Sequence, residues 1–190
     1  MPNNILIFLR HAETKINNEV IVSKWILTKK GKEEAKLLLK SAIFDNTELI
    51  ITSNEEKAFE TALPLVVRLN KPIIREKKLN EIVRDRGSLF ATKEEYNRNI
   101  KLCMEKRNKS FNKWETANHA LRRFSKKVRD IEKKYTKKKI LIVSHGVVIN
   151  LYFAKILRCL DFVFERWLSN SFCDYGIIQN GKVLKDIAKI

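Results

Sequence analysis

The chain has 190 residues, enough for one domain with a substantial core. Hydrophobic residues make up 44% of it, and the 5 glycines and 3 prolines are too few for low-complexity linkers, so the composition excludes a disordered chain. The formal net charge is +17, a balance that attracts anions such as nucleic acid, acidic membrane or phosphorylated small molecules. Because the basic residues are spread along the chain and interleaved with glutamates, we interpret them first as a solvated surface.

The cysteine pattern and the hydropathy pattern bear on the compartment. Cys103, Cys159 and Cys173 are odd in number, widely spaced and free of any C-x-x-C motif, which predicts neither a disulfide framework nor a cysteine-based zinc site. The apolar run at 5–9 is too short for a signal sequence, and no segment approaches the ~20 apolar residues of a membrane helix. We therefore expect a cytoplasmic protein with reduced thiols and no membrane partner.

Four short apolar runs predict the strands of a sheet. The runs at 5–9, 49–51 and 140–143 are continuously apolar, which is typical of strands buried on both faces of a parallel sheet. A shorter strand is expected at 72–74. Near the C-terminus, Asn180-Gly181 between two apolar segments predicts a hairpin.

Helical spacing separates these runs. Thr28 precedes a helical pattern that extends through Ala42, and a second helix, capped by Ser53 or Asn54, is expected to end at about Leu69. Further helices are expected at about 116–135 and 147–157. The stretch at 80–115 is polar, basic and weakly periodic, and we interpret it as an excursion, part loop and part helix.

Alternating strands and helices predict the fold class. We expect an α/β protein, a single three-layer α/β/α domain over residues 1–190, with a mostly parallel central sheet and the excursion at about 80–115 lying over the site. Ligands of such sheets bind beyond the carboxyl ends of the strands. Polar residues follow three of the predicted strands there: Arg10-His11, Ser53 to Lys57, and Ser144-His145. They should therefore converge at one edge of the sheet.

The residue types at that edge suit phosphoryl transfer. A guanidinium beside an imidazole disfavours the imidazolium, so Arg10 should keep His11 neutral and nucleophilic. Arginine also offers a planar fork to phosphate oxygens. His145 opens a helix, whose N–H groups favour an anion, and Gly146 permits close approach of the backbone.

With these residues in view, the sequence resembles the histidine phosphatase superfamily, also called the phosphoglycerate mutase-like family. The matches follow the family's order from residue 5 to about residue 178. They are Leu9-Arg10-His11-Ala12-Glu13-Thr14 for L-R-H-G-E-T, Asn17, Leu27-Thr28-Lys29-Lys30-Gly31 for L-T-x-x-G, Ser53 to Ala62 for S-x-x-x-R-A-x-x-T-A, Leu79-Asn80-Glu81 for L-x-E, Val143-Ser144-His145-Gly146 for V-S-H-G, and Leu168-Ser169-Asn170-Ser171 near the end.

The resemblance implies a role for each matched residue. It implies that His11 attacks phosphorus to form a phosphohistidine, while Arg10 and His145 hold the phosphoryl oxygens. It implies that Glu81 protonates the leaving oxygen and then activates water, and that Asn17 lies near the pocket mouth. It implies no cofactor and no metal, and the sequence contains no metal-binding pattern.

Two positions depart from the family pattern. Ala12 replaces the usual glycine after the nucleophile, so the backbone there must avoid a positive φ. Lys57 replaces the second phosphate-binding arginine, and lysine supplies a charge without a bidentate fork. Arg84 and Arg86 are candidates for the missing fork, because Arg84 lies three residues beyond Glu81. We expect weakened activity or an altered substrate choice rather than loss of function.

Three functions remain open on the sequence. The first is a phosphatase acting on a small anionic phosphorylated substrate, with Arg84 and Arg86 binding an anionic group beyond the phosphate. The second is a phosphoglycerate mutase, although the excursion is short for the larger lid of a mutase. The third is a catalytically weak basic protein that binds RNA through clusters such as Lys137-Lys138-Lys139; we rank it below the enzyme because no RNA-binding motif occurs. The sequence does not predict the oligomeric state.

Overall fold

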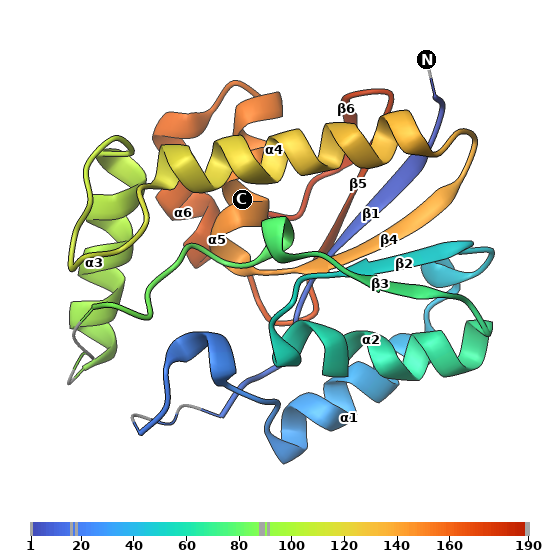
Figure 1. Cartoon of the computed structure of the whole chain (residues 1–190), viewed down its shortest axis with the longest axis horizontal. Helices are drawn as coiled ribbons and strands as arrows, with labels where there is room; N and C mark the ends of the chain where they lie inside the picture. The colour runs from blue at the N-terminus through green and yellow to red at the C-terminus, as the bar shows by residue number, and fades with distance from the viewer. Residues whose placement is uncertain (1, 16, 18, 88–89, 91, 189–190) are drawn as a thin grey trace.

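The computed structural model describes residues 2–15, 17, 19–87, 90 and 92–188. A six-stranded sheet in the order β3-β2-β4-β1-β5-β6 forms the middle layer (Figure 1). Its strands are β1 (Ile5–Arg10), β2 (Leu49–Thr52), β3 (Ile73–Arg75), β4 (Lys139–Ser144), β5 (Tyr175–Gln179) and β6 (Lys182–Lys185). The first four are parallel to one another, while β5 pairs antiparallel with β1 and with β6. The expected mostly parallel sheet is confirmed.

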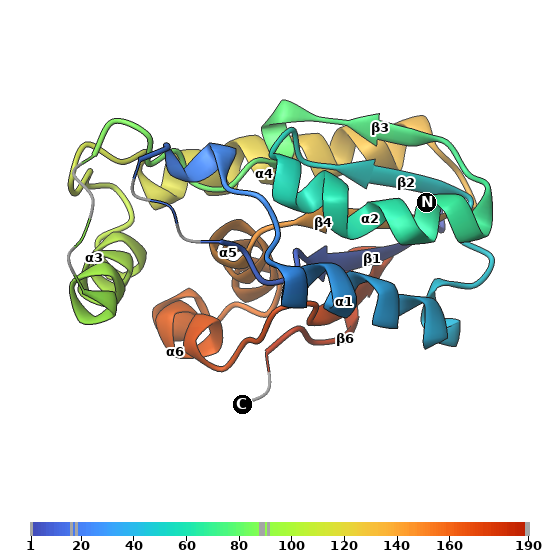
Figure 2. The same cartoon turned by 90° about the horizontal axis from the view of Figure 1, so that it is seen from below.

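The central strands are buried on both faces because helices cover both. α1 (Lys29–Leu37) and α2 (Glu56–Leu69) lie on one face; α4 (Ala117–Lys134), α5 (Gly146–Ile156) and α6 (Val163–Leu168) lie on the other (Figures 1 and 2). Successive β1 side chains alternate between two cores. Phe8 packs with the core under α4 and α5, and Ile7 with the core under α2. The three-layer arrangement places the carboxyl ends of β1, β2 and β4 at one edge.

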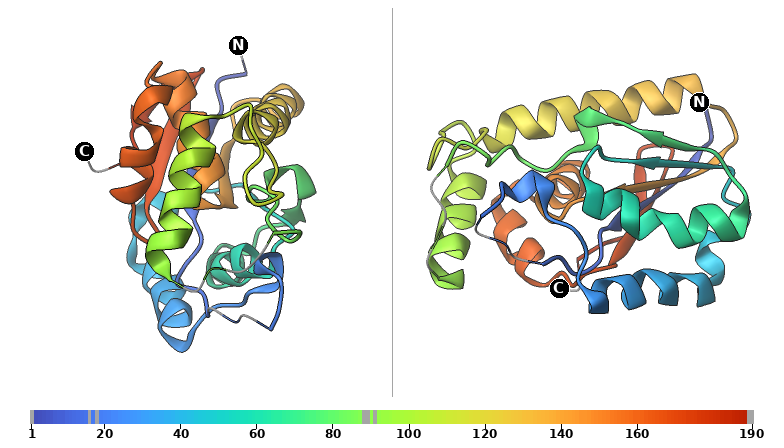
Figure 3. Two further views of the ribbon diagram at one scale, coloured as in Figure 1. Left: turned by 90° about the vertical axis from the view of Figure 1, so that its left-hand side faces the viewer. Right: turned by 60° about the horizontal axis from the view of Figure 1, so that its bottom comes forward.

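The segment at 80–115 leaves the sheet at that same edge. The segment contains helix α3 (Lys93–Glu105), which lies beyond the ends of the strands and packs against α6 (Figure 3). The predicted excursion, part loop and part helix, therefore covers the end of the sheet where the polar motifs lie.

Two predicted helix boundaries are wrong. The first helix ends at Leu37 rather than reaching Ala42, because two 3-10 turns follow and bury Phe44, which is 1% exposed. Neither Ser53 nor Asn54 caps α2, which starts after Glu55 without a side-chain cap. The Ser53 hydroxyl instead accepts the backbone N–H of Glu55 and contacts His145, so it serves the site rather than the helix.

The described ranges contain neither a membrane-spanning helix nor a metal-binding cluster. None of the helices there is both long and apolar enough to cross a bilayer. Nor do three or more His, Cys, Asp or Glu side chains gather in a metal-binding group among those residues. The cysteines Cys103, Cys159 and Cys173 are free thiols.

Candidate active site

Two histidines meet at the carboxyl edge of the sheet. β1 and β4 are neighbours, and their last residues, Arg10 and Ser144, are paired in register. Each strand is followed at once by a histidine, so the ring centroids of His11 and His145 lie 5.1 Å apart. Both rings are buried, at 7% and 0% exposure. The predicted convergence of the two motifs is confirmed.

The surroundings of His11 set its charge and its tautomer. Burial holds the pKa of His11 well below its ordinary 6.5, and the neighbouring His145, Lys57 and Arg10 lower it further. Its Nδ1 lies 2.8 Å from the carbonyl oxygen of Ala12, which can only accept, so Nδ1 carries the proton. The Nε2 atom of a neutral ring then holds the lone pair and is the nucleophilic atom.

The backbone after His11 suits an alanine. Ala12 does not have a positive φ, so a residue with a Cβ fits this backbone conformation without strain. Its N–H donates to the hydroxyl of Thr61 on α2 at 3.0 Å, and Thr61 in turn donates to the carbonyl of Lys57. The departure from glycine at this position is therefore compatible with the turn.

Arg10 is held in place by contacts at one end of its guanidinium. Nη1 donates to the carbonyl of Asn170 at 3.2 Å, and the group lies 4.8 Å from the ring centre of Phe172. Nε is buried and has no partner among the described residues. A Cβ added at Gly146 would lie 3.2 Å from that Nε. Glycine at 146 thus makes room for the guanidinium at the start of α5.

His145 also presents an unpaired donor. Its Nε2 lies 2.7 Å from Ser53 Oγ, and Ser53 already accepts the N–H of Glu55. Ser53 is therefore free to donate to Nε2, which leaves the proton of the neutral ring on Nδ1. That atom is buried and has no partner within the described part of the chain. Burial, followed by the charges of Lys57 and Arg84, holds the pKa of His145 well below 6.5. Unpaired buried donors call for an acceptor, and an oxyanion supplies one.

Lys57 reaches the site, but it is engaged there. Its side chain is 2% exposed, and Nζ lies 2.7 Å from Glu55 Oε2 and donates to the carbonyl of Val22 at 2.8 Å. Burial lowers the pKa of the ammonium, and Glu55 opposes that shift. The positive charge of Lys57 lowers the pKa of both His11 and His145.

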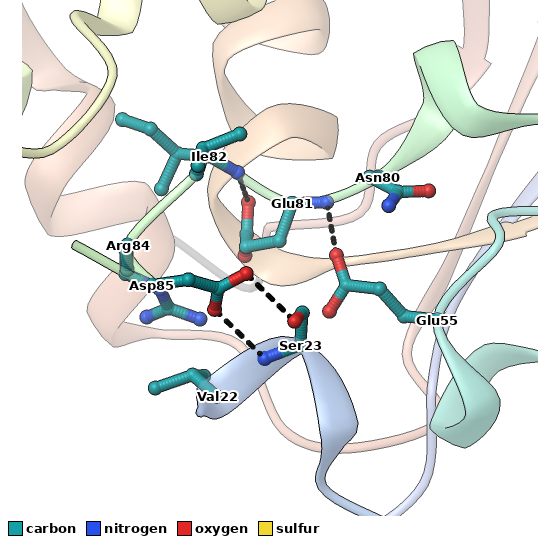
Figure 4. A pocket seen from close by; sticks show the side chains of 9 residues that line it. Val22, Ser23, Glu55, Asn80, Glu81, Ile82, Arg84 and Asp85 are labelled. Atoms are coloured by element: carbon teal, nitrogen blue, oxygen red, sulfur yellow. Dashed lines mark hydrogen bonds between the residues drawn. The ribbon is translucent and has the colours of Figure 1, made fainter. Parts of the chain in front are cut away.

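Glu81 caps helix α5 from the excursion. The side chain is 6% exposed, and its two oxygens accept the N–H groups of Val147, Val148 and Ile82 at 3.0 to 3.1 Å. Its own N–H donates to Glu55 Oε1 at 2.8 Å (Figure 4). The buried position of Glu81 beside the start of α5 makes it part of the site and not a surface glutamate.

The two candidate substrate arginines differ in position. Arg84 lies over the rings of Tyr96 and Trp114, bonds the Tyr96 hydroxyl, and lines a cavity of about 40 Å³ together with Glu55 and Glu81 (Figure 4). Arg86 is exposed. The structure thus brings Arg84 into the site's surroundings and leaves Arg86 on the surface.

Asn17 lies in the loop between β1 and α1. Its side-chain oxygen accepts the N–H of Glu19 at 2.9 Å, and its carbonyl accepts the indole N–H of Trp25. Further along this loop, the 3-10 turn Val22–Lys24 forms part of the cavity wall. Its Ser23 donates through both its N–H and its hydroxyl to Asp85, which also lines the cavity. A contact of Asn17 with the phosphoryl group stays a prediction.

Sequence reasoning gave no site role to several residues that the structure places here. They are Thr61, Asn170 and Phe172, together with Ser53 and Glu55, which belong to a cluster expected at this edge but have no individual role in that expectation. The sequence signal for Glu55 is an acidic residue two positions before Lys57 and three positions after the end of a buried strand. The other contacts depend on segments far apart in the chain, for which the sequence offered no register.

Several proteins of known structure share this fold. The chain is similar to mycobacterial glucosyl-3-phosphoglycerate phosphatase, with 15% identity, a TM-score of 0.77, and coverage of 97% of this chain and 99% of that one. It is similar to Bacillus stearothermophilus YhfR, with 23% identity, a TM-score of 0.76, and coverage of 98% of this chain and 96% of that one. It is also similar to the phosphoserine phosphatase of Entamoeba histolytica, with 21% identity, a TM-score of 0.70, and coverage of 95% of this chain and 96% of that one. At these identities the likeness shows a common fold. A search of curated protein sequences gave no match. The family model of the histidine phosphatase superfamily (branch 1) matches residues 6–175, and the chain belongs to that superfamily.

Proposed function

We propose that this protein is a phosphatase that hydrolyses phosphomonoesters through a phosphohistidine on His11. The observation that carries the proposal is the pairing of two buried, neutral imidazoles 5.1 Å apart beside Arg10, a half-buried residue whose Nε is buried. A neutral ring with its proton fixed on Nδ1 offers Nε2 to phosphorus. The names of the structural relatives, among them two phosphatases of small phosphorylated molecules, are consistent with hydrolysis.

The phosphoryl group would be held by donors that the protein itself leaves unpaired. Arg10 Nε and His145 Nδ1 are both buried N–H groups at the end of the sheet, and an oxyanion would complete their hydrogen bonding. Gly146 leaves room beside Arg10, and the charge of Lys57, although paired with Glu55, lowers the pKa of both rings and so favours their neutral forms. Preorganised donors of this kind stabilise the charge that spreads over the equatorial oxygens in the transition state.

Glu81 is the proposed general acid and base. It accepts the N–H groups of Val147 and Val148 in the first turn of α5, directly after His145, and it lines the cavity together with Arg84 (Figure 4). In this arrangement the leaving oxygen takes a proton from Glu81 as the phosphohistidine forms, and the resulting carboxylate takes a proton from the attacking water in the second step. Arg84 is the proposed contact for an anionic group of the substrate beyond the phosphate, and Arg86 a more distant one.

A screen of phosphorylated metabolites, run with EDTA and with His11→Ala as control, tests the proposal. We expect release of free phosphate by the wild-type protein and loss of that activity in the variant. Incubation with phosphoglycerate separates hydrolysis from the rival mutase activity, since hydrolysis yields free phosphate and a mutase yields the isomer. Salt-dependent RNA retention without turnover of any phosphomonoester would favour the basic binding protein instead.

A further inference from the structure

A buried ion pair occupies the place where the family pattern has an arginine. Lys57 and Glu55 are 2% and 5% exposed, and Lys57 Nζ lies 2.7 Å from Glu55 Oε2. Lys57 Nζ also donates a hydrogen bond to the carbonyl oxygen of Val22 at 2.8 Å. The ammonium that would attract a phosphoryl group is therefore already neutralised by a carboxylate of the protein.

The other oxygen of Glu55 faces the remaining groups of the site. Glu55 Oε1 accepts the N–H of Glu81 at 2.8 Å (Figure 4). The same oxygen lies 3.5 Å from Nε2 of His145. One carboxylate thus contacts the lysine, the proposed acid and the second histidine at once. A salt bridge this well buried gains little net stability over an apolar pair, so its placement among these groups calls for an explanation from function.

A carboxylate and a phosphoryl group compete for the same kind of partner. Both are oxyanions that seek N–H donors and positive charge. Glu55 places a negative charge 3.5 Å from Nε2 of His145, on the same ring whose Nδ1 would hold a phosphoryl oxygen, and like charges at short range in a buried site repel. Lys57 cannot bond a phosphate oxygen at full strength while it is paired with Glu55.

We propose that Glu55 is an internal counter-anion that sets the site's affinity for phosphate: by pairing with Lys57 it weakens the binding of the phosphoryl group, including that of the orthophosphate product. This role rests on the proposed function only in that the competing anion is a phosphoryl group. The consequence is a site that binds orthophosphate weakly and releases it readily, with Arg10 and His145 as the donors that remain unpaired.

Calorimetric titration with inorganic phosphate at constant ionic strength tests the inference. Glu55→Gln keeps an oxygen that can accept the N–H of Glu81 and removes the charge. We expect its Kd for phosphate to fall about tenfold or more below that of the wild-type protein. Glu56→Gln is the matched control, because it makes the same change of charge one residue away on a carboxylate that pairs with Arg75 at the surface. It should change the Kd by less than about twofold. An unchanged or raised Kd for Glu55→Gln, with a native circular dichroism spectrum, would overturn the inference.

The double variant Glu55→Gln, Lys57→Gln shows whether Lys57 transmits the effect. If the ion pair is responsible, removing Lys57 as well abolishes most of the gain produced by Glu55→Gln, and Lys57→Gln alone, which leaves the charge of Glu55 unpaired, does not raise phosphate affinity. A gain that persists in full in the double variant would contradict the pairing mechanism. Because this assay measures binding, it is independent of turnover: absence of phosphohistidine in the wild-type protein would refute the proposed function and leave the role of Glu55 to the titration.

Discussion

Gly146→Ala should reduce activity without weakening the fold. The added Cβ would lie 3.2 Å from Arg10 Nε, 3.3 Å from Arg10 Cζ and 3.1 Å from Trp167 Nε1. These distances are shorter than ordinary van der Waals contact by a few tenths of an ångström. The guanidinium cannot yield freely, because its Nε is buried, its Nη1 donates to the Asn170 carbonyl, and it lies over the ring of Phe172. The methyl group must therefore displace Arg10 from its present position.

The expected size of the effect follows from that displacement. A misplacement of a catalytic group by about 1 Å can cost on the order of a hundredfold in rate, and the smaller shift expected here should lower kcat/KM roughly tenfold to a hundredfold. The fold should not suffer, because residue 146 is the first residue of α5, has no positive φ, and alanine is favoured over glycine in helices by up to about 1 kcal/mol.

Two measurements on the purified variant check this prediction. The first is kcat/KM for an aryl phosphate, and the second is the midpoint of thermal unfolding, which should be equal to or above that of the wild-type protein. Gly31→Ala is the contrasting variant, since its Cβ would lie 2.1 Å from the carbonyl oxygen of Glu13 and must destabilise the fold. Wild-type activity in Gly146→Ala would refute the reasoning, as would an activity loss that merely follows unfolding.

Three further outcomes are expected. Because the folded state keeps His11 and His145 neutral while the unfolded chain protonates them below about pH 6.5, the free energy of unfolding should be constant above that pH and fall on acidification by up to about 1 kcal/mol per pH unit for each ring. Urea titrations from pH 5 to 8 measure this, and a fall of stability toward high pH would contradict it. Glu81→Gln should lose roughly a hundredfold in kcat on an alkyl phosphate and far less on a dinitrophenyl phosphate, whose leaving group needs no proton, so equal losses would rule out acid catalysis. Arg84→Gln should raise KM for substrates with a second anionic group more than for a simple aryl phosphate, whereas Arg86→Gln, on the surface, should have the smaller effect; equal shifts on both substrates would remove Arg84 from substrate binding.

Much of the fold was predictable because the sheet's centre is apolar without interruption. The runs at 5–9, 49–51 and 140–143 have no amphipathic alternation, and the structure buries them as neighbouring parallel strands. From that arrangement the meeting of His11 and His145 follows directly, since both come one residue after such a strand.

The helix ends and the ionic contacts were harder to predict. The apolar residues after Leu37 keep a helical spacing, yet the chain there forms 3-10 turns that bury Phe44. Burial of Phe44 depends on tertiary packing, which the local spacing of apolar residues does not predict. Similarly, Ser53 has the side chain of a helix cap, but the nearby ring of His145 competes for its hydroxyl. The pairing of Lys57 with Glu55 depends on how two side chains of one turn are directed into a buried site, which spacing along the chain leaves open.

The most direct test of the central claim is to trap the phosphoenzyme and locate its phosphoryl group. After rapid quenching of a turnover mixture in alkali, peptide mass spectrometry and ³¹P NMR should find an acid-labile phosphoramidate on His11, bonded through Nε2, and none in His11→Asn. Efficient release of phosphate without any phosphohistidine, or with phosphate on another residue, would contradict the account.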